Sequence, residues 1–213
     1  MVLQKIFITG IDTDAGKTYA AGWYARTLMD RGLSVATQKF IQTGNIDMSE
    51  DIEAHRRLMG IPLMEVDKAH VTAPIIFTHP ASAQLAASLD GRDIDLRLID
   101  EATERLAAEF DVVLIEGAGG IMAPVTDDFL TIDYIASRDL PVAVVTNSRL
   151  GSINHTLLTL EAVKHHGLRL HSVMYNTFYD GTDALIDADT RGFVERYVRR
   201  HFPEAEFLLV PVL

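Results

Sequence analysis

The stretch that decides the fold is KIFITGIDTDAGKTYAAGWYARTL, residues 5–28. It starts with an apolar run that reaches Gly10, and a helical pattern follows that opens with Gly16, Lys17 and Thr18. Glycines and the N-terminus of a helix present backbone N–H groups to phosphate. A lysine in such a loop contacts the β- and γ-oxygens, and the hydroxyl beside it ligates magnesium. The stretch therefore predicts a phosphate-binding loop between a strand and a helix.

The spacing inside this loop is unusual. Phosphate-binding loops of the common form have four residues between the first glycine and the Gly-Lys pair. Here five residues separate Gly10 from Gly16. The extra residue predicts a longer loop, in which Thr13 and Asp14 face the phosphates or the phosphoryl acceptor. A glycine turn with a chance Lys-Thr pair is the alternative interpretation.

Short β-rich runs alternate with helical patterns along the rest of the chain. Most of the runs are continuous Val, Ile and Leu segments, which is typical of strands covered on both faces. We expect strands at 5–9, 34–40, 111–116, 141–147, 170–178 and 206–212, and helices near 17–31, 50–59, 82–90, 95–110, 129–138, 153–166 and 183–201. The alternation predicts an α/β fold of the P-loop NTPase type, with a doubly wound, mainly parallel sheet and helices on both faces. We expect residues 1–213 to form a single P-loop domain.

The composition narrows the possible functions. The chain has 213 residues, a formal net charge of −11, 48% hydrophobic residues and no cysteine. The absence of cysteine excludes disulfides, thiolate catalysis and cysteine-bound zinc. The negative charge argues against nucleic-acid and anionic-membrane partners. The sequence shows no signal-peptide pattern and no apolar run of about 18 residues, so we expect a cytoplasmic protein.

Polar residues follow the second expected strand. In open parallel sheets, ligands bind beyond the carboxyl ends of the strands. Lys39 stands at such an end, Thr43 follows it, and Asp51 lies in an acidic helix start. Lys39 could equally be a solvated lysine, and Asp51 could serve only the helix dipole. Because Asp51 is expected to lie opposite a phosphate loop, we consider it a candidate magnesium ligand.

The third expected strand, DVVLIE, ends in Glu116 and is followed by Gly117, Ala118, Gly119 and Gly120. In phosphate-loop enzymes an acid at the end of a buried strand commonly reaches magnesium. The glycines let the backbone approach phosphate closely. A glycine turn with an exposed Glu116 is the alternative, but a buried strand seldom ends in a charge that has no partner.

Four segments taken together resemble dethiobiotin synthetases: TGIDTDAGKT, QKFIQTG, IEGAGG and LGSINHTLLT. They occur in the family's order and cover nearly the whole chain, and the five-residue gap in the loop is the family's form. The resemblance implies a C–N-forming cyclo-ligase of biotin biosynthesis. Its substrates would be 7,8-diaminononanoate, CO2 and ATP with Mg2+, and its products dethiobiotin, ADP and phosphate. Positioning and charge stabilisation would dominate the catalysis.

The resemblance also assigns residues to roles. The catalytic residues would be Lys39, Lys17 and Thr13. The substrate would contact Thr43, Asp14, Ser152, Ile153 and Asn154, of which the last three would hold its carboxylate across a homodimer interface. ATP would contact Asp14, Ala15, Gly16, Lys17, Thr18, Tyr19, Asp51, Glu116, Gly117, Ala118, Gly119, Asn176, Pro211, Val212 and Leu213. Magnesium would be bound by Thr18, Asp51 and Glu116.

Two departures from the family pattern carry expectations. The family usually has proline after its second lysine, whereas this chain has Phe40, so we expect a less rigid loop. The chain stops at FLLVPVL, before a further loop and helix that enclose the base in relatives. Asn176 alone would then read the base. We therefore expect other nucleoside triphosphates to be accepted with a penalty of about tenfold to a hundredfold.

Two other classes of protein fit parts of the pattern. A synthetase domain of cobyrinate amidation would be accompanied by a glutaminase domain with a nucleophilic cysteine, for which the chain has neither room nor cysteine. A nucleotide-switch ATPase of the partition type needs a signature lysine early in its loop, where this chain has Asp12, Thr13 and Asp14.

Overall fold

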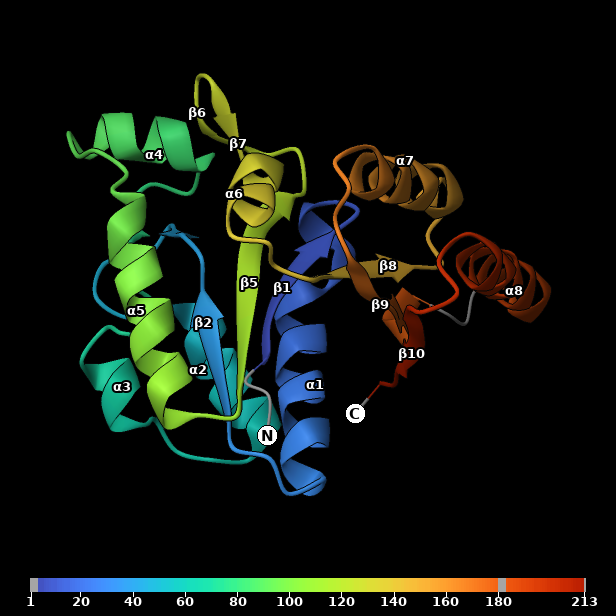
Figure 1. The fold of residues 1–213 in the computed structure, drawn as a ribbon, viewed down its shortest axis with the longest axis horizontal. Helices are drawn as coiled ribbons and strands as arrows, with labels where there is room; N and C mark the ends of the chain where they lie inside the picture. Colours follow the sequence, from blue (N-terminus) through green and yellow to red (C-terminus); the bar gives the residue numbers. More distant parts are fainter. Residues whose placement is uncertain (1–3, 180–182, 213) are drawn as a thin grey trace.

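A sheet of six parallel strands forms the centre of the structure, a computed structural model that describes residues 4–179 and 183–212 (Figure 1). The strand order is β10-β9-β8-β1-β5-β2, and every pairing in this sheet is parallel. The strands are β1 (Gln4–Gly10), β2 (Val35–Lys39), β5 (Val112–Gly120), β8 (Val142–Asn147), β9 (Leu170–Asn176) and β10 (Glu206–Val210). The chain first extends the sheet on one side of β1 and then on the other. The strand order therefore reverses beside β1, where open α/β sheets bind ligands.

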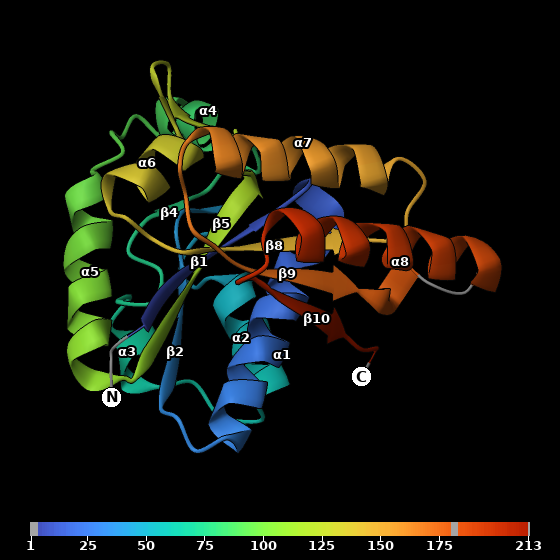
Figure 2. The same ribbon diagram turned by 45° about the vertical axis from the view of Figure 1, so that its right-hand side comes forward.

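Helices cover both faces of the sheet (Figures 1 and 2). One face packs against α1 (Lys17–Asp30) and the adjoining α2 (Glu50–Met59). The other packs against α5 (Leu96–Glu109), α6 (Thr131–Ser137), α7 (Ser152–His165) and α8 (Ala184–His201). In β1 the buried Ile6 and Ile8 face α1 while Phe7 faces the opposite layer. The predicted doubly wound α/β class is confirmed.

The helices α1 and α2 approach each other closely at Gly22. A Cβ atom at this residue would lie 2.7 Å from Cδ1 and 2.8 Å from Cβ of Leu58, so only glycine fits without displacement. This contact brings the start of α2 toward the start of α1. It therefore brings Asp51 near Thr18, which are 33 residues apart in sequence.

Several short elements were absent from the sequence prediction. They are η1 (Thr13–Ala15), the parallel pair β3 (Gln42–Thr43) and β4 (Ile76–Phe77), α3 (Glu65–Lys68), the hairpin β6 (Pro124–Thr126) and β7 (Phe129–Leu130), and η2 (Thr177–Tyr179). Elements of two to four residues are too short to show a hydrophobic period. The helix expected at 82–90 is α4 (Ala83–Leu89), and the strands expected at 170–178 and 206–212 end two residues earlier.

The prediction that the third strand ends at Glu116 is wrong. Strand β5 continues through the glycine-rich segment to Gly120, which pairs with Gly10 of β1. Glycine is a poor strand former, so the sequence suggested a loop. The tertiary pairing with β1 overrides that preference.

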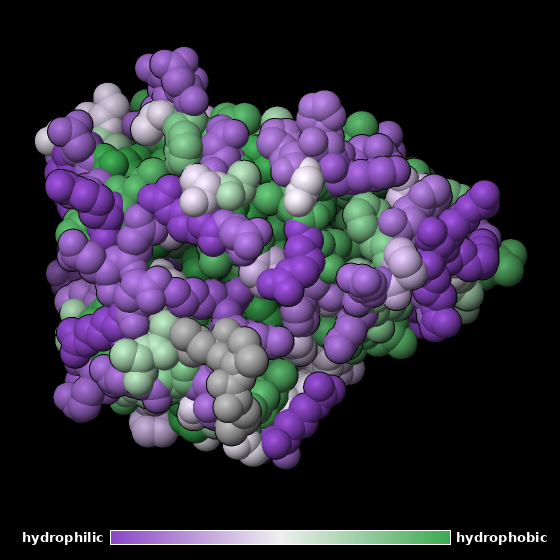
Figure 3. Space-filling view, in the orientation of Figure 1, coloured by the Kyte–Doolittle hydropathy of each residue, from purple (hydrophilic) through white to green (hydrophobic). Residues whose placement is uncertain are grey.

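The face of the molecule seen in Figure 3 is largely hydrophilic, and apolar residues show mainly between polar ones. None of the helices in the described part of the chain combines the length and the apolar character needed to cross a membrane. That residues 1–213 act as one domain stays a prediction.

Candidate active site

The phosphate-loop sequence wraps the space beyond the carboxyl end of β1. Gly16 has φ +89°, and a Cβ there would lie 2.1 Å from Nδ2 of Asn176, so the position requires glycine. Lys17 begins α1, and its ammonium donates to the carbonyls of Asp12 and Thr13, each at 3.0 Å. Burial lowers the pKa of Lys17 to about 8. The loop thus holds a desolvated cation at the helix N-terminus, which favours an anionic ligand.

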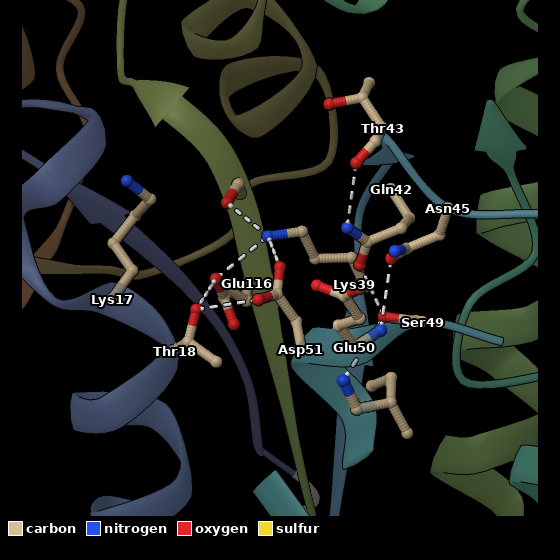
Figure 4. Close-up of polar contacts among 12 residues, drawn as sticks. Lys17, Thr18, Lys39, Gln42, Thr43, Asn45, Ser49, Glu50, Asp51 and Glu116 are labelled. Atoms are coloured by element: carbon tan, nitrogen blue, oxygen red, sulfur yellow. Dashed lines mark hydrogen bonds and ion pairs between the residues drawn. The ribbon is translucent and has the colours of Figure 1, made fainter. Parts of the chain in front are cut away.

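Four side chains from different elements converge beside this loop (Figure 4). The Thr18 hydroxyl lies 3.0 Å from Oδ1 of Asp51 and 2.9 Å from Oε1 of Glu116. The Lys39 ammonium forms an ion pair with Asp51 and lies 2.9 Å from Oε1 of Glu116. The residues come from α1, α2, β2 and β5, so the sheet order and the α1–α2 contact assemble the cluster.

Burial makes the charges of this cluster interdependent. Glu116 is 1% exposed and Lys39 is 5% exposed. Burial opposes ionisation of Glu116, but the Lys39 ammonium and the contact with His55 outweigh it and hold the pKa of Glu116 well below its usual range. Burial likewise opposes the charge of Lys39, but Glu116 and Asp51 raise the pKa of that ammonium. Both groups are therefore charged at neutral pH.

The donor set at Thr18 fits magnesium. A hydroxyl and two carboxylates meet there, and magnesium prefers such oxygen ligands, usually one or two carboxylates together with substrate phosphates and water. Across residues 4–179 and 183–212, no group of three or more His, Cys, Asp or Glu side chains gathers as a metal site. One hydroxyl and two carboxylates match a metal whose coordination is completed by phosphates and water.

A cavity of about 540 Å³ lies in front of this cluster. The predicted residues that line it are Thr13, Asp14, Gly16, Lys17, Thr18, Lys39, Thr43, Asp51, Glu116, Ala118 and Gly119. A second cavity of about 520 Å³ shares Thr13, Thr43, Ala118 and Gly119 with it and is more apolar, with Phe40 and residues 80–83 and 123–125 in its wall. The two cavities together offer a polar region beside an apolar one.

Other predicted residues lie at the edge of the site. Asn176 is buried, its amide donates to the carbonyl of Ala15 at 3.2 Å, and its Oδ1 accepts from the backbone of Phe178. The Tyr19 hydroxyl donates to the carbonyl of Pro211 at 2.9 Å, which ties the end of the chain to α1. Val212 is exposed, and Leu213 lies outside the described residues. In this structure Asn176 supports the loop, and its contact with a base stays a prediction.

The residues predicted for the substrate carboxylate lie apart from both cavities. Ser152 is buried at the start of α7, Ile153 is partly exposed and Asn154 is exposed. None of the three lines either of the two cavities described above. Their position outside both cavities fits the prediction only if they contact substrate bound to a neighbouring subunit.

Comparison with known proteins agrees with this geometry. A family model described as an AAA domain matches residues 4–213. The ATP-dependent dethiobiotin synthetase BioD 2 of Pasteurella multocida is 44% identical over 210 residues, covering 99% of this chain and 98% of that protein. The corresponding protein of Haemophilus ducreyi is 45% identical, covering 96% and 97%. The ATP-dependent dethiobiotin synthetase BioD of Chlorobaculum tepidum is 43% identical, covering 95% and 84%.

The chain belongs to the dethiobiotin synthetase family. The resemblance seen in the four sequence segments is thereby confirmed. Solved structures add information on the fold alone. FtsY of Elizabethkingia anophelis in complex with GDP has a TM-score of 0.54 at 14% identity, covering 97% of this chain and 56% of that one. Chloroplast FtsY of Physcomitrella patens has the same TM-score at 15% identity, covering 97% and 57%.

Two positions within the family pattern have packing roles that the sequence did not reveal. Gly117 was assigned to the nucleotide, yet it is buried in β5 and does not line the first cavity. Its Cβ position is 2.8 Å from the ring of Phe7. Phe40, in place of the family's proline, is buried against Phe7 and Tyr134, and its N–H donates to the carbonyl of Glu116 at 2.8 Å. A proline cannot donate that bond, so Phe40 anchors the loop rather than loosening it.

Sequence reasoning missed two residues beside the site. Arg149 lines the first cavity, and its guanidinium lies 3.1 Å from Oδ2 of Asp12. His55 is fully buried, and its Nε2 lies 2.7 Å from Oε2 of Glu116. A helical position four residues after Asp51 faces the same side as Asp51, and this spacing could have revealed His55. Arg149 gave a weaker signal, since it only follows the end of β8.

Proposed function

We propose that this protein is an ATP-dependent dethiobiotin synthetase, acting as a single P-loop domain in the cytoplasm. The observation that carries the proposal is the convergence of Thr18, Lys39, Asp51 and Glu116 beside the phosphate loop. It occurs in a chain 44% identical to a synthetase over almost its entire length. The reaction would consume 7,8-diaminononanoate, CO2 and ATP and release dethiobiotin, ADP and phosphate.

The chain's own residues would act mainly by positioning. The loop N–H groups and Lys17 bind the β- and γ-phosphates. One amine of the substrate combines with CO2 to form a carbamate, whose oxygen attacks the γ-phosphorus as ADP leaves. The second amine then attacks the carbamoyl carbon, closes the ring and expels phosphate. Lys39 lies where its charge can stabilise the transferring phosphoryl group, because it reaches the same cavity as Lys17.

Magnesium would be held by Thr18, Asp51 and Glu116. Bound there with the nucleotide, it would neutralise charge on the phosphates. The two carboxylates now bonded to Lys39 would turn part of their bonding to the ion, leaving the ammonium available to the substrate. The buried setting keeps these interactions strong, since effective dielectric constants are lower there than in water.

The substrate-carboxylate site would be completed by a second copy of the chain. Ser152, Ile153 and Asn154 open a helix of 14 residues, whose N-terminus suits a carboxylate. Large apolar side chains near this helix are exposed, namely Leu150, Leu158 and Met122. A homodimer in which α7 of one subunit faces the cavity of the other would bury such residues, and their exposure supports this part of the proposal.

A product assay tests the proposed reaction. Purified protein is incubated with MgATP and bicarbonate, with and without 7,8-diaminononanoate, and ADP and dethiobiotin are measured by mass spectrometry. We expect both products in equal amounts, only with the diamine, and a loss of two or more orders of magnitude in Lys39→Ala. ATP hydrolysis that ignores the diamine would favour a nucleotide-switch ATPase. Activity close to wild type in Lys39→Ala would exclude the assigned role.

A mixing experiment tests the shared site. Lys39→Ala and Asn154→Ala chains are each assayed alone and after co-refolding in equal amounts. If α7 serves the neighbouring cavity, the mixture regains up to about a quarter of wild-type activity. Random pairing makes half of the dimers mixed, and half of the sites in a mixed dimer contain neither substitution. A mixture no more active than its parents, although light scattering shows dimers, would contradict the shared site.

A further inference from the structure

A buried histidine reaches the active-site carboxylate from behind. His55 lies on α2, four residues after Asp51, and is fully buried. Its Nε2 is 2.7 Å from Oε2 of Glu116, and its Nδ1 is 3.0 Å from the hydroxyl of Thr37. Oε1 of the same carboxylate contacts Thr18 and Lys39. The two oxygens of Glu116 thus have separate partners.

The neighbours of His55 favour one position for its proton. The Thr37 hydroxyl oxygen accepts from Nη1 of Arg56 at 2.8 Å. Arg56 is itself buried and held by two bonds to Asp67, at 2.7 and 2.8 Å. Since arginine can only donate, Thr37 keeps its own hydroxyl proton for an acceptor, and Nδ1 of His55 lies 3.0 Å away. A neutral imidazole that accepts this proton carries its own on Nε2, the ring nitrogen that lies 2.7 Å from Oε2 of Glu116.

This chain of contacts lies in the interior of the protein. Each member is buried, and it runs from the Asp67 ion pair through Arg56, Thr37 and His55 to Glu116. Without the histidine N–H, Oε2 would be a buried charged oxygen that has lost its closest donor, which is costly. The carboxylate would then rotate to share Oε1 and Oε2 among Thr18 and Lys39.

We propose that His55 is a positioning residue that fixes the Glu116 carboxylate with Oε1 toward Thr18 and Lys39, so that the residues that would hold magnesium stay together. The inference rests on the proposed function for the identity of the metal-nucleotide site. Partners that orient ligating groups in this way typically change metal affinity or activity by about 10–100-fold when removed. His55 acts through Glu116 and does not contact substrate.

The chain offers matched variants. His55→Gln keeps an N–H donor near the Nε2 position, whereas His55→Leu has similar bulk and no donor. Thr37→Val removes the hydroxyl that orients the ring. Thr103→Val removes another buried hydroxyl, one that bonds to Gln38 and to the carbonyl of Ile99, away from the carboxylates. It serves as the control for a general loss of buried polar contacts.

Calorimetric titration with the ATP analogue AMP-PNP, in Mg2+ and in EDTA, measures the magnesium contribution to binding without turnover. We expect His55→Leu to lower that contribution by about 10–100-fold and to leave binding in EDTA within about twofold of wild type. His55→Gln should restore most of it, Thr37→Val should be intermediate, and Thr103→Val should match wild type.

Folding is checked for each variant by circular dichroism. A folded His55→Leu with wild-type magnesium dependence would overturn the proposal, as would a His55→Gln no better than His55→Leu. If His55→Leu does not fold, wild-type magnesium dependence in Thr37→Val overturns it. Failure of the wild type to make dethiobiotin would contradict the proposed function. The role of His55 would still be decided by the magnesium dependence of AMP-PNP binding in the variants.

Discussion

Adding a single methyl group at Gly117 should destabilise the fold rather than abolish nucleotide binding. A Cβ at this residue would lie 2.8 Å from Cε1 and 3.1 Å from Cζ of Phe7. Contacts below about 3 Å force one partner to move. Phe7 is fully buried, with Phe40 at 5.5 Å and Tyr134 at 6.3 Å between ring centroids. The ring therefore has no open space into which it can shift.

The size of the effect follows from overpacking. An extra methyl in a filled core typically costs about 1–3 kcal/mol. For a chain of this length each kcal/mol lowers the melting temperature by roughly 2–4 °C, so Gly117→Ala should melt about 2–12 °C below wild type. Gly120, three residues further along the same strand, is the matched control. A Cβ there would meet only the carbonyl of Gly10, at 3.5 Å, an ordinary contact.

Thermal and urea denaturation, followed by circular dichroism, compare Gly117→Ala with Gly120→Ala. A second test replaces Phe7 by leucine in both backgrounds. If the ring is the obstacle, the double variant should lose less free energy of unfolding than the two single variants lose together. The difference should be about 0.5–3 kcal/mol. Equal stability of the two alanine variants would refute the packing argument, and so would additivity with Phe7→Leu.

Three further predictions concern other residues. Lys17→Ala should weaken binding of AMP-PNP, measured by calorimetry, and lower turnover, measured by ADP release, by two or more orders of magnitude. The reason is that the loop loses the cation expected to contact the phosphates. Binding equal to wild type would contradict this prediction. Phe40→Pro should lower the free energy of unfolding by about 3 kcal/mol or more, measured by urea denaturation, since it removes both a buried ring and the N–H bonded to Glu116. Phe40→Leu keeps the N–H and should lower that free energy by less. Burial, together with Arg169 and against the opposing effect of Glu206, lowers the pKa of His171, which also packs near Tyr24. The unfolded chain therefore binds a proton more readily than the folded one, and stability falls as pH drops below about 6.5. From pH 7.5 to pH 5.5, the melting temperature of His171→Gln should fall less than that of wild type. Parallel curves of melting temperature against pH would contradict the prediction.

The sequence was sufficient to predict the layers of the fold and most of the candidate site. The strands of the sheet are apolar runs because they are covered on both faces. Lys39 ends β2 and Thr18 lies in the first turn of the helix after β1, near the edge where such sheets bind ligands. Asp51 was predicted from its position opposite the loop. These features depend on local pattern and on the rule that relates strand ends to sites.

What the sequence could not predict depends on contacts between distant segments. The glycine run after Glu116 reads as a loop, but pairing with Gly10 makes it strand. In the sequence, Phe40 is only a residue that replaces the family's proline; its role depends on the packing of its ring against Phe7 and Tyr134. His55 reads as an ordinary helical residue until β5 brings Glu116 to it, 61 residues later in the chain.

The central place of β1 has a consequence for how the protein is made. This strand is synthesised first, but its two neighbours are β5, which begins at Val112, and β8, which begins at Val142. A ribosome adds about 5–20 residues per second, so the apolar strand waits on the order of ten seconds for its second neighbour. During that interval its edges are open to other chains. The strand that leads into the proposed phosphate loop is thus open to aggregation during translation, and a nascent chain stalled before β8 emerges cannot complete the sheet.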